Sequence, residues 1–127
     1  MTENEITYLI RKAIFNVYNS LGPGLLESVY EKILAYELED YGLEVKTQLP
    51  ISVIYNGINF DIGFRADILV EDRIIIEIKS VKKIEDVHHK QLLTYLKLAN
   101  KELGILVNFN TDRIDKNIFR KVNGFKE

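Results

Sequence analysis

The chain has 127 residues, of which 46% are hydrophobic and 28% charged, with a formal net charge of −2 and no cysteine. This composition excludes disulfides, thiolate metal sites, a membrane-spanning apolar run and a uniformly basic nucleic-acid binder, and the acidic N-terminus is unlike a secretory signal. We therefore expect one globular domain over residues 1–127, cytoplasmic and outside the membrane.

Two helices are predicted at the N-terminus. Residues 3–20 repeat apolar side chains at helical spacing, and Gly22-Pro23-Gly24 breaks the chain after them. A second helix is predicted at roughly 25–41, with Gly42 placed to end it as a left-handed cap. Its apolar side is assigned to Leu26, Val29, Tyr30, Ile33 and Tyr41.

The period of the apolar pattern then changes to two. From 43 to 55 the apolar residues are mostly odd-numbered, which predicts one shared face if the strand runs on. Pro50 favours an edge strand or a break in it. Asn56-Gly57 is a strong hairpin turn signal that leads into residues 58–60.

A strand is predicted at about 62–70, with a bulge at Gly63, and another at 74–80 after a polar turn at 71–73. Both contain continuous runs of Ile, Leu and Val, which are typical of central strands covered on both faces.

A third helix is predicted over 85–100, with its apolar positions assigned to Val87, Leu92, Tyr95, Leu96 and Ala99. The strand at 103–109 follows a helix and is therefore expected to pair parallel to an earlier strand. The segment 118–122 fits either a short edge strand or a turn of helix. The order α-α-β-β-β-α-β predicts an α/β or α+β sandwich around one central sheet.

Three polar residues interrupt the two central strands. Glu77 and Lys79 are two residues apart and project from one face of their strand, while Asp67 lies on the preceding strand. A three-residue loop at 71–73 pairs Val70 with Ile74 and sets Asp67 opposite Glu77, whereas a two-residue loop would separate them. The first register is therefore a testable consequence of a site that contains both acids.

Two carboxylates this close repel each other unless a cation lies between them. Magnesium suits such a site because it binds few protein oxygens and completes its octahedron with water and phosphate. Lys79 beside it would orient or deprotonate a water, or stabilise negative charge on phosphorus.

Each residue also has a purely structural interpretation. Glu-x-Lys on a strand is common on solvated faces, and Glu27 in the first turn of a helix complements the helix dipole. Arg65 either contacts a substrate phosphate or balances the carboxylates. His88 and His89 are expected to be solvated or to contact phosphate, and not to bind metal.

The motifs resemble a known family. They are Gly24-Leu25-Leu26-Glu27-Ser28-Val29-Tyr30, Phe64-Arg65-Ala66-Asp67-Ile68-Leu69-Val70, Ile76-Glu77-Ile78-Lys79-Ser80, Gln91-Leu92-Leu93-Thr94-Tyr95-Leu96 and Gly104-Ile105-Leu106-Val107-Asn108-Phe109. In this order, over roughly residues 5–122, they resemble the GxxExxY protein family, which looks like a branch of the PD-(D/E)XK nuclease superfamily. The resemblance implies a restriction-endonuclease-like α-β-β-β-α-β core with an added N-terminal helix.

The resemblance also implies roles for residues. Glu27 would be the helix carboxylate that completes or supports a metal site held by Asp67 and Glu77. Glu77 and Lys79 form the (D/E)-x-K element, and Gln91 belongs to a Q-x-x-x-Y helix whose Gln lies near that site. Tyr30 and Tyr95 are expected to orient their neighbours.

The leading hypothesis is a magnesium-dependent nuclease, with manganese as a substitute, that hydrolyses phosphodiester bonds of DNA or RNA, with DNA favoured over RNA as the partner. The alternative is a catalytically weak nuclease-fold module that binds nucleic acid or a protein partner. A third interpretation treats these charges as surface salt bridges. Six Lys and two His between residues 79 and 101 offer a modest basic patch. The small domain suggests a homodimer or a larger partner, with the second helix and Phe119 as candidate surfaces.

Overall fold

A computed structural model describes residues 1–124, so the last three residues of the domain expected over 1–127 lie outside the described residues. The elements in chain order are α1 (Glu3–Leu21), α2 (Glu27–Asp40), β1 (Val45–Tyr55), β2 (Ile58–Val70), β3 (Ile74–Lys79), α3 (Asp86–Ala99), β4 (Leu103–Asn108), the 3₁₀ turn η1 (Ile114–Lys116) and β5 (Ile118–Val122).

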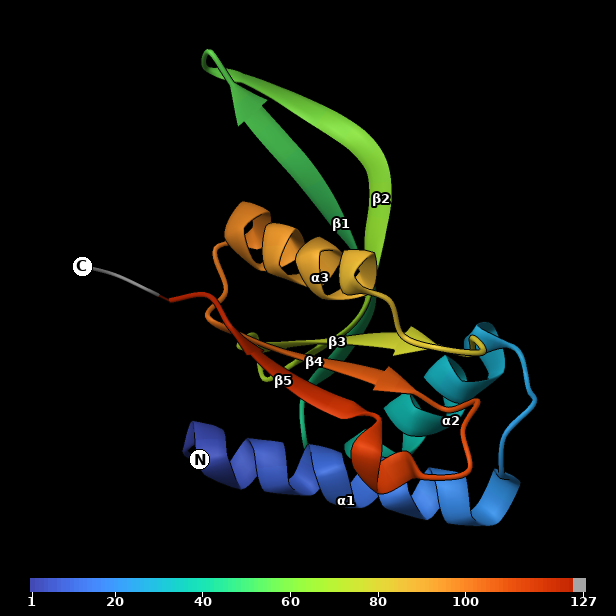
Figure 1. Cartoon of the computed structure of the whole chain (residues 1–127). Coiled ribbons are helices and arrows are strands. Elements are labelled where there is room, and N and C mark those ends of the chain that lie inside the picture. The colour runs from blue at the N-terminus through green and yellow to red at the C-terminus, as the bar shows by residue number, and fades with distance from the viewer. Residues whose placement is uncertain (125–127) are drawn as a thin grey trace.

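The five strands form one mixed sheet in the order β1-β2-β3-β4-β5. Strands β3 and β4 are parallel and the other pairs are antiparallel. Helices α1 and α2 cover one face of the sheet and α3 covers the other (Figure 1). The expected α+β class and the parallel fourth strand are confirmed, and of the two alternatives left open for 118–122 the structure has the edge strand. No helix among residues 1–124 is long and apolar enough to cross a membrane.

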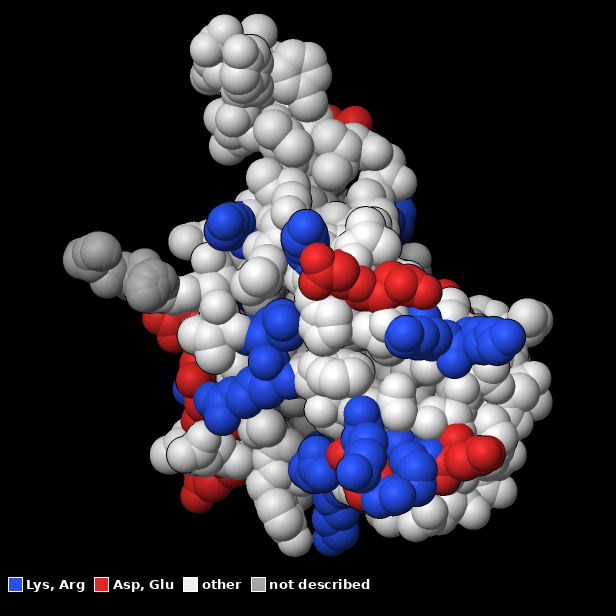
Figure 2. Space-filling model, viewed as in Figure 1, with Lys and Arg blue, Asp and Glu red and all other residues white. Residues whose placement is uncertain are grey.

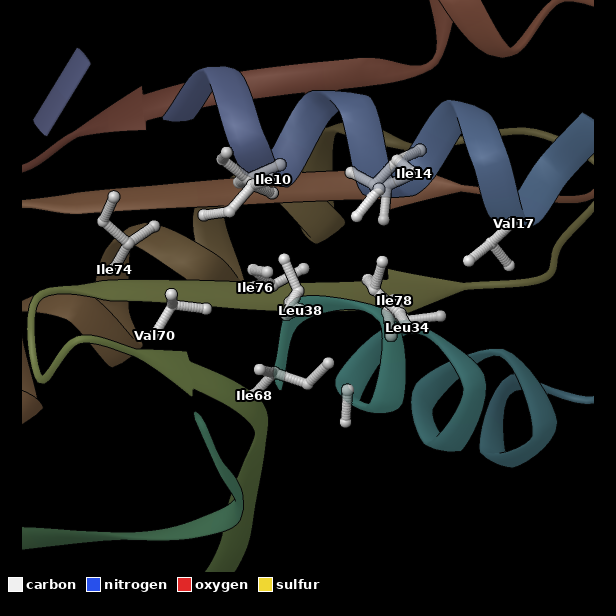
Figure 3. Close-up of a cluster of buried hydrophobic side chains, with 14 of the residues drawn as sticks. Ile10, Ile14, Val17, Leu34, Leu38, Ile68, Val70, Ile74, Ile76 and Ile78 are labelled. Atoms are coloured by element: carbon white, nitrogen blue, oxygen red, sulfur yellow. The ribbon is translucent and has the colours of Figure 1, made fainter. Parts of the chain in front are cut away.

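The central strands are buried on both faces, as their continuous apolar runs predicted. The even-numbered residues Ile68, Ile76 and Ile78 pack against α1 and α2, where Figure 3 shows them beside Ile10 and Leu38. Leu69 and Ile75 of the same strands pack under α3 on the other face, together with Ala66 of β2. The site residues at 67, 77 and 79 therefore interrupt an otherwise apolar interior.

The predicted apolar side of α2 is largely wrong. The residues of α2 that reach the core are Tyr30, Leu34, Ala35 and Leu38. Leu26, Val29 and Ile33 are exposed, because this helix carries apolar side chains on two faces and only one of them meets the sheet. Gly42 does follow the helix in a left-handed conformation, with φ of 88°. In α3, Val87 was also misassigned and is exposed.

Strand β1 does not keep one apolar face along its length. Leu43 and Val45 pack with the α1/α2 core, whereas Leu49 and Ile51 pack under α3. The switch occurs at Gln48, whose φ of 56° interrupts the alternation of a regular strand. Figure 1 shows β1 and β2 bending together between the sheet and the projecting part of the hairpin.

The outer half of the β1–β2 hairpin extends beyond the helices (Figure 1). The register shifts between Ile51 and Ser52, so that Ile62 and Gly63 have no partners on β1. Gly63 has φ of 70°, and its amide donates to Asp61 Oδ1 at 2.8 Å. The bulge predicted at Gly63 is confirmed.

Candidate active site

The turn between β2 and β3 fixes the register of the carboxylates. Val70 pairs with Ile74 across the turn at residues 71–73, and the register extends to place Asp67 opposite Glu77. Each carboxylate accepts a hydrogen bond from the neighbouring strand: Ile78 N donates to Asp67 Oδ2 at 2.7 Å, and Asp67 N donates to Glu77 Oε2 at 3.0 Å. The two carboxylates therefore take the place of backbone carbonyls as hydrogen-bond acceptors where β2 and β3 begin to separate. The register that a shared site requires is confirmed.

Both carboxyl groups lie in surroundings that disfavour their charge. Glu77 is only 4% exposed, and burial, followed by the nearby charge of Asp67, raises its pKa to about 8. Burial also raises the pKa of Asp67 to about 6, against the hydrogen bond from Ile78 N, which favours the charged form. A pair of acids held in this way has a strong electrostatic need for a cation.

Lys79 provides the nearest positive charge. It lies two residues after Glu77 on β3, and its charge lowers the pKa of both Asp67 and Glu77, although less than burial raises them. Within residues 1–124 neither acid forms an ion pair: the three pairs found there are Lys90–Asp86, Lys101–Asp72 and Arg113–Asp115, all at the surface. The charge of Lys79 therefore acts on the acids without neutralising them.

Glu27 joins α2 to the end of β3. Its exposed carboxylate accepts a hydrogen bond from Ser80 N at 3.0 Å, and the Ser80 hydroxyl donates to Leu25 O at 2.7 Å. The chain entering α2 is thus tied to the residue directly after Lys79. In this arrangement Glu27 is bound to the end of β3 and does not lie between Asp67 and Glu77.

Glu31 is a fourth acid near the site that sequence reasoning missed. Its charge raises the pKa of Asp67 and ranks ahead of the effects of Lys79 and Glu27. Gln48 Nε2, from the bend of β1, donates to Glu31 Oε1 at 2.8 Å. The available signal was its spacing, because residues four apart on a helix share a face, so that Glu27 implies a neighbour at Glu31.

Helix α3 lies on the face of the sheet opposite α1 and α2, and it brings Tyr95 near the two acids. Tyr95 is 6% exposed and its ring stacks on Phe64 with 3.8 Å between centroids. Burial raises its pKa to about 12, and the charges of Glu77 and Asp67 add to the shift, so its hydroxyl lies within their field. Gln91 is half-buried one turn earlier on the same helix, which places it on the same side as Tyr95.

Tyr30 has the orienting role that the sequence suggested. Its hydroxyl donates to Gly22 O at 2.5 Å and accepts from Leu25 N at 3.2 Å, which holds the loop before α2. Its ring is fully buried and stacks on Phe109.

Neither histidine of α3 is placed as a metal ligand. His88 Nδ1 accepts from Glu85 N at 2.8 Å and caps the helix. His89 packs edge-on against Phe119, and burial lowers its pKa.

The donors at this position fit a hard divalent cation. Among residues 1–124 no group of three or more His, Cys, Asp or Glu is arranged to hold a metal ion. Glu77 nevertheless supplies a buried carboxylate and Asp67 a half-buried one. Magnesium is commonly bound by one or two carboxylates with water and substrate oxygens as its other ligands. The chemistry of this pair therefore fits such an ion.

Comparison with known families gives one match. A family model described as the PD-(D/E)XK nuclease superfamily matches residues 4–121, which is nearly the whole chain. No match was found among curated proteins or among solved structures.

Proposed function

Because the chain belongs to the PD-(D/E)XK nuclease superfamily, we propose that it is a magnesium-dependent nuclease that hydrolyses phosphodiester bonds of DNA at Asp67, Glu77 and Lys79. The observation that carries this proposal is the pair formed by the buried Glu77 and the half-buried Asp67. The register of β2 and β3 sets the two acids face to face, and neither has an ion-pair partner within residues 1–124. Within the superfamily, the motif Gly24–Tyr30 supports assignment to the GxxExxY branch.

In this proposal Asp67 and Glu77 hold the cation, with manganese able to replace magnesium. When bound, the ion polarises a phosphoryl oxygen and lowers the pKa of a bound water. The hydrogen bonds from Ile78 N and Asp67 N fix the orientation of both carboxylates before the ion arrives. This preorganisation is what a catalytic site needs, since oriented donors lose little freedom when the substrate binds.

Lys79 acts on the reacting groups. Its ammonium group, near both acids, would orient the attacking water or donate a hydrogen bond to a phosphoryl oxygen as negative charge increases there. Glu27 positions this lysine through Ser80 N, because that hydrogen bond fixes the end of β3. We assign Gln91, on the site side of α3, to orienting water or substrate.

The distribution of charge supports a nucleic-acid substrate. Residues 79–124 contain ten Lys and Arg against five Asp and Glu, whereas residues 1–78 contain six against thirteen. Basic side chains gather over α3, β5 and η1 on the face shown in Figure 2. The net charge of −2 therefore hides a cationic surface, and phosphate neutralisation by such a surface supplies most of the affinity for nucleic acid.

The decisive experiment is a cleavage panel. Purified protein is incubated with labelled single-stranded, duplex, nicked and branched DNA and RNA, in magnesium, manganese or chelator. We expect metal-dependent cleavage that Lys79→Ala reduces by roughly 10²–10⁴-fold and that Asp67→Asn abolishes. Asn at position 67 keeps an oxygen for Ile78 N, so the loss would reflect the charge and not the fold.

Lys46→Ala is the matched control, because Lys46 is an exposed strand lysine on β1. Cleavage that survives both site variants, or that Lys46→Ala removes equally, would defeat the assignment.

The alternative of a catalytically weak binding module has one specific observation in its favour. The Glu27 carboxylate is engaged by Ser80 N, so only two acids face each other between β2 and β3. The same panel separates the two functions. Binding that persists in chelator, without cleavage under any metal, would identify the module.

A further inference from the structure

The outer part of the β1–β2 hairpin, residues 52–63, is here called the arm. It begins beyond the Ile51–Phe64 pair, at the register shift, and ends at the turn Asn56-Gly57. Figure 1 shows it projecting past α3, with no helix packed along it. The arm is therefore a two-stranded ribbon, and such ribbons are at best marginally stable in water without a covering layer.

The two faces of the arm differ in polarity. The pairs Val53–Phe60 and Tyr55–Ile58 share one face, because directly opposed residues of antiparallel strands point to the same side. The pairs Ser52–Asp61 and Ile54–Asn59 share the other face. By alternation along β1, the apolar face continues the side on which Ile51 packs under α3.

This apolar face has no cover within residues 1–124. Tyr55 is 65% exposed, Ile58 57% and Phe60 48%. Exposed apolar patches of this kind on soluble proteins usually mark an interaction site. The face extends the hydrophobic layer beneath α3 beyond the end of its own cover, which indicates that something else packs there.

Charge indicates which partner fits. Residues 49–64 contain a single charged side chain, Asp61, and it lies on the opposite face. The projecting arm is correspondingly almost uncoloured in Figure 2. A face without cations offers nothing to the phosphates of nucleic acid. In contrast, a two-fold axis packs the same surface of two copies together, so any charge on that surface would face a like charge. The apolar face of the arm carries no charge, and two copies of it can therefore meet without repulsion.

The area of this face can be compared with what a dimer needs. Its large apolar side chains, Tyr55, Ile58 and Phe60, are 48–65% exposed. With side chains of this size, they present on the order of 350 Å². A stable interface buries about 800 Å² on each partner. The apolar face of the arm therefore supplies about half of the area that one side of a dimer needs, which suits the centre of such a contact.

We propose that two copies of this chain form a homodimer by packing the apolar faces of their arms together across a two-fold axis. Val53, Tyr55, Ile58 and Phe60 of each copy form the centre of the contact. This inference concerns assembly and is independent of the proposed nuclease function.

Sedimentation equilibrium of the full chain over a wide concentration range tests the proposal. Wild-type protein should approach twice the mass of one chain as concentration rises. Ile58→Asp should raise the concentration needed for half-dimerisation by on the order of a hundredfold, because it places two desolvated like charges near the axis. Ile54→Asp is the matched control: it makes the same change at an exposed isoleucine on the other face, and dimerisation should persist.

A second measurement uses the absence of native cysteine. Under mild oxidation, Tyr55→Cys should form a crosslinked dimer at low concentration, whereas Ile54→Cys should crosslink poorly. A wild-type chain that stays monomeric throughout would overturn the proposal. A dimer that withstands Ile58→Asp would also overturn it, and would place the contact elsewhere, such as on the exposed apolar side of α2.

Discussion

Strand β2 passes through two environments. Its inner part, residues 66–70, is covered by helices on both faces of the sheet and includes the half-buried carboxylate of Asp67. Its outer part, residues 58–63, is exposed throughout, yet three of its six residues are large and apolar. A charged group therefore lies inside and isoleucines and a phenylalanine lie outside, which is the reverse of what hydrophobicity alone favours.

Both the acids in the inner part and the apolar side chains in the outer part are energetically unfavourable in the isolated chain. The inner acids are destabilised by burial and by each other, and a cation would relieve them. The outer side chains are destabilised by water, and a second apolar surface would cover them. Positions where local chemistry conflicts with its surroundings are where function is expected, since a sequence selected only for folding would have removed the conflict.

The same substitution, Ile to Ala, made in the inner and in the outer part of β2 compares how much each part contributes to the free energy of unfolding. Ile68 is fully buried, so Ile68→Ala should lower the free energy of unfolding by about 2–5 kcal/mol. Ile58 is 57% exposed, so Ile58→Ala should change it by about 0.5 kcal/mol or less when measured on dilute protein. Urea unfolding followed by circular dichroism gives both values. Equal losses would show that the arm is as well packed as the core.

A divalent cation should stabilise the inner part alone. At a concentration one hundred times its dissociation constant, magnesium or manganese should add about 2.7 kcal/mol to the free energy of unfolding. Asp67→Asn should remove this gain, while Ile58→Asp on the arm should leave it intact. The measurement is the midpoint temperature of thermal unfolding with and without the divalent metal. The sample without metal contains a monovalent salt at the same concentration. A shift that Asp67→Asn retains would place the ion elsewhere.

Without metal, stability should depend on pH through the same acids. The pKa of Glu77 is raised to about 8, so the folded state keeps a proton that the unfolded chain releases above its ordinary value near 4.5. Stability should therefore fall as pH rises between these values, by at most about 1.4 kcal/mol per pH unit for one proton.

Asp67, with its pKa raised to about 6, adds a slope of the same sign over the lower part of that range. Glu77→Gln should flatten the upper part, between pH 6 and 8, which urea titrations at several pH values will detect. A wild-type stability that rises across this range would contradict the assignment of both pKa shifts.

Much of the fold follows from the sequence because it depends on local signals. The polar turn after Val70 allowed two registers, and the hypothesis of a shared site selected the three-residue turn that pairs Val70 with Ile74, as the structure shows. The apolar side of α2 was not predictable in the same way, because Leu26 and Leu34 have similar chemistry and only the tertiary contact with the sheet decides which one is buried.

The candidate site shows the same limit. Motif residues were recognisable one by one, and the spacing of Glu31 from Glu27 was a signal as well, but the contact of Glu31 with Gln48, whose φ is 56°, was not predictable. No residue preference predicts a left-handed glutamine inside a strand, since the conformation is set by the bend of the whole hairpin and not by its own side chain.

The smallest expected effect lies at the boundary between the two environments. Gly63 has φ of 70°, and an added Cβ would meet no heavy atom within 4 Å, so Gly63→Ala should cost only the backbone strain of about 1 kcal/mol. Gly63→Asn should cost less, because asparagine tolerates this conformation better. Urea unfolding of dilute protein measures both costs.

The effect on assembly should exceed the effect on folding. Gly63 forms the bulge that aims the arm, so a strained bulge should tilt the apolar face and weaken dimerisation while the inner acids keep their register. Sedimentation equilibrium and metal-dependent cleavage, run on the same Gly63→Ala protein, separate these outcomes. If cleavage fell while dimerisation held, the bulge would serve the site, and the division of β2 into two independent regions would be wrong.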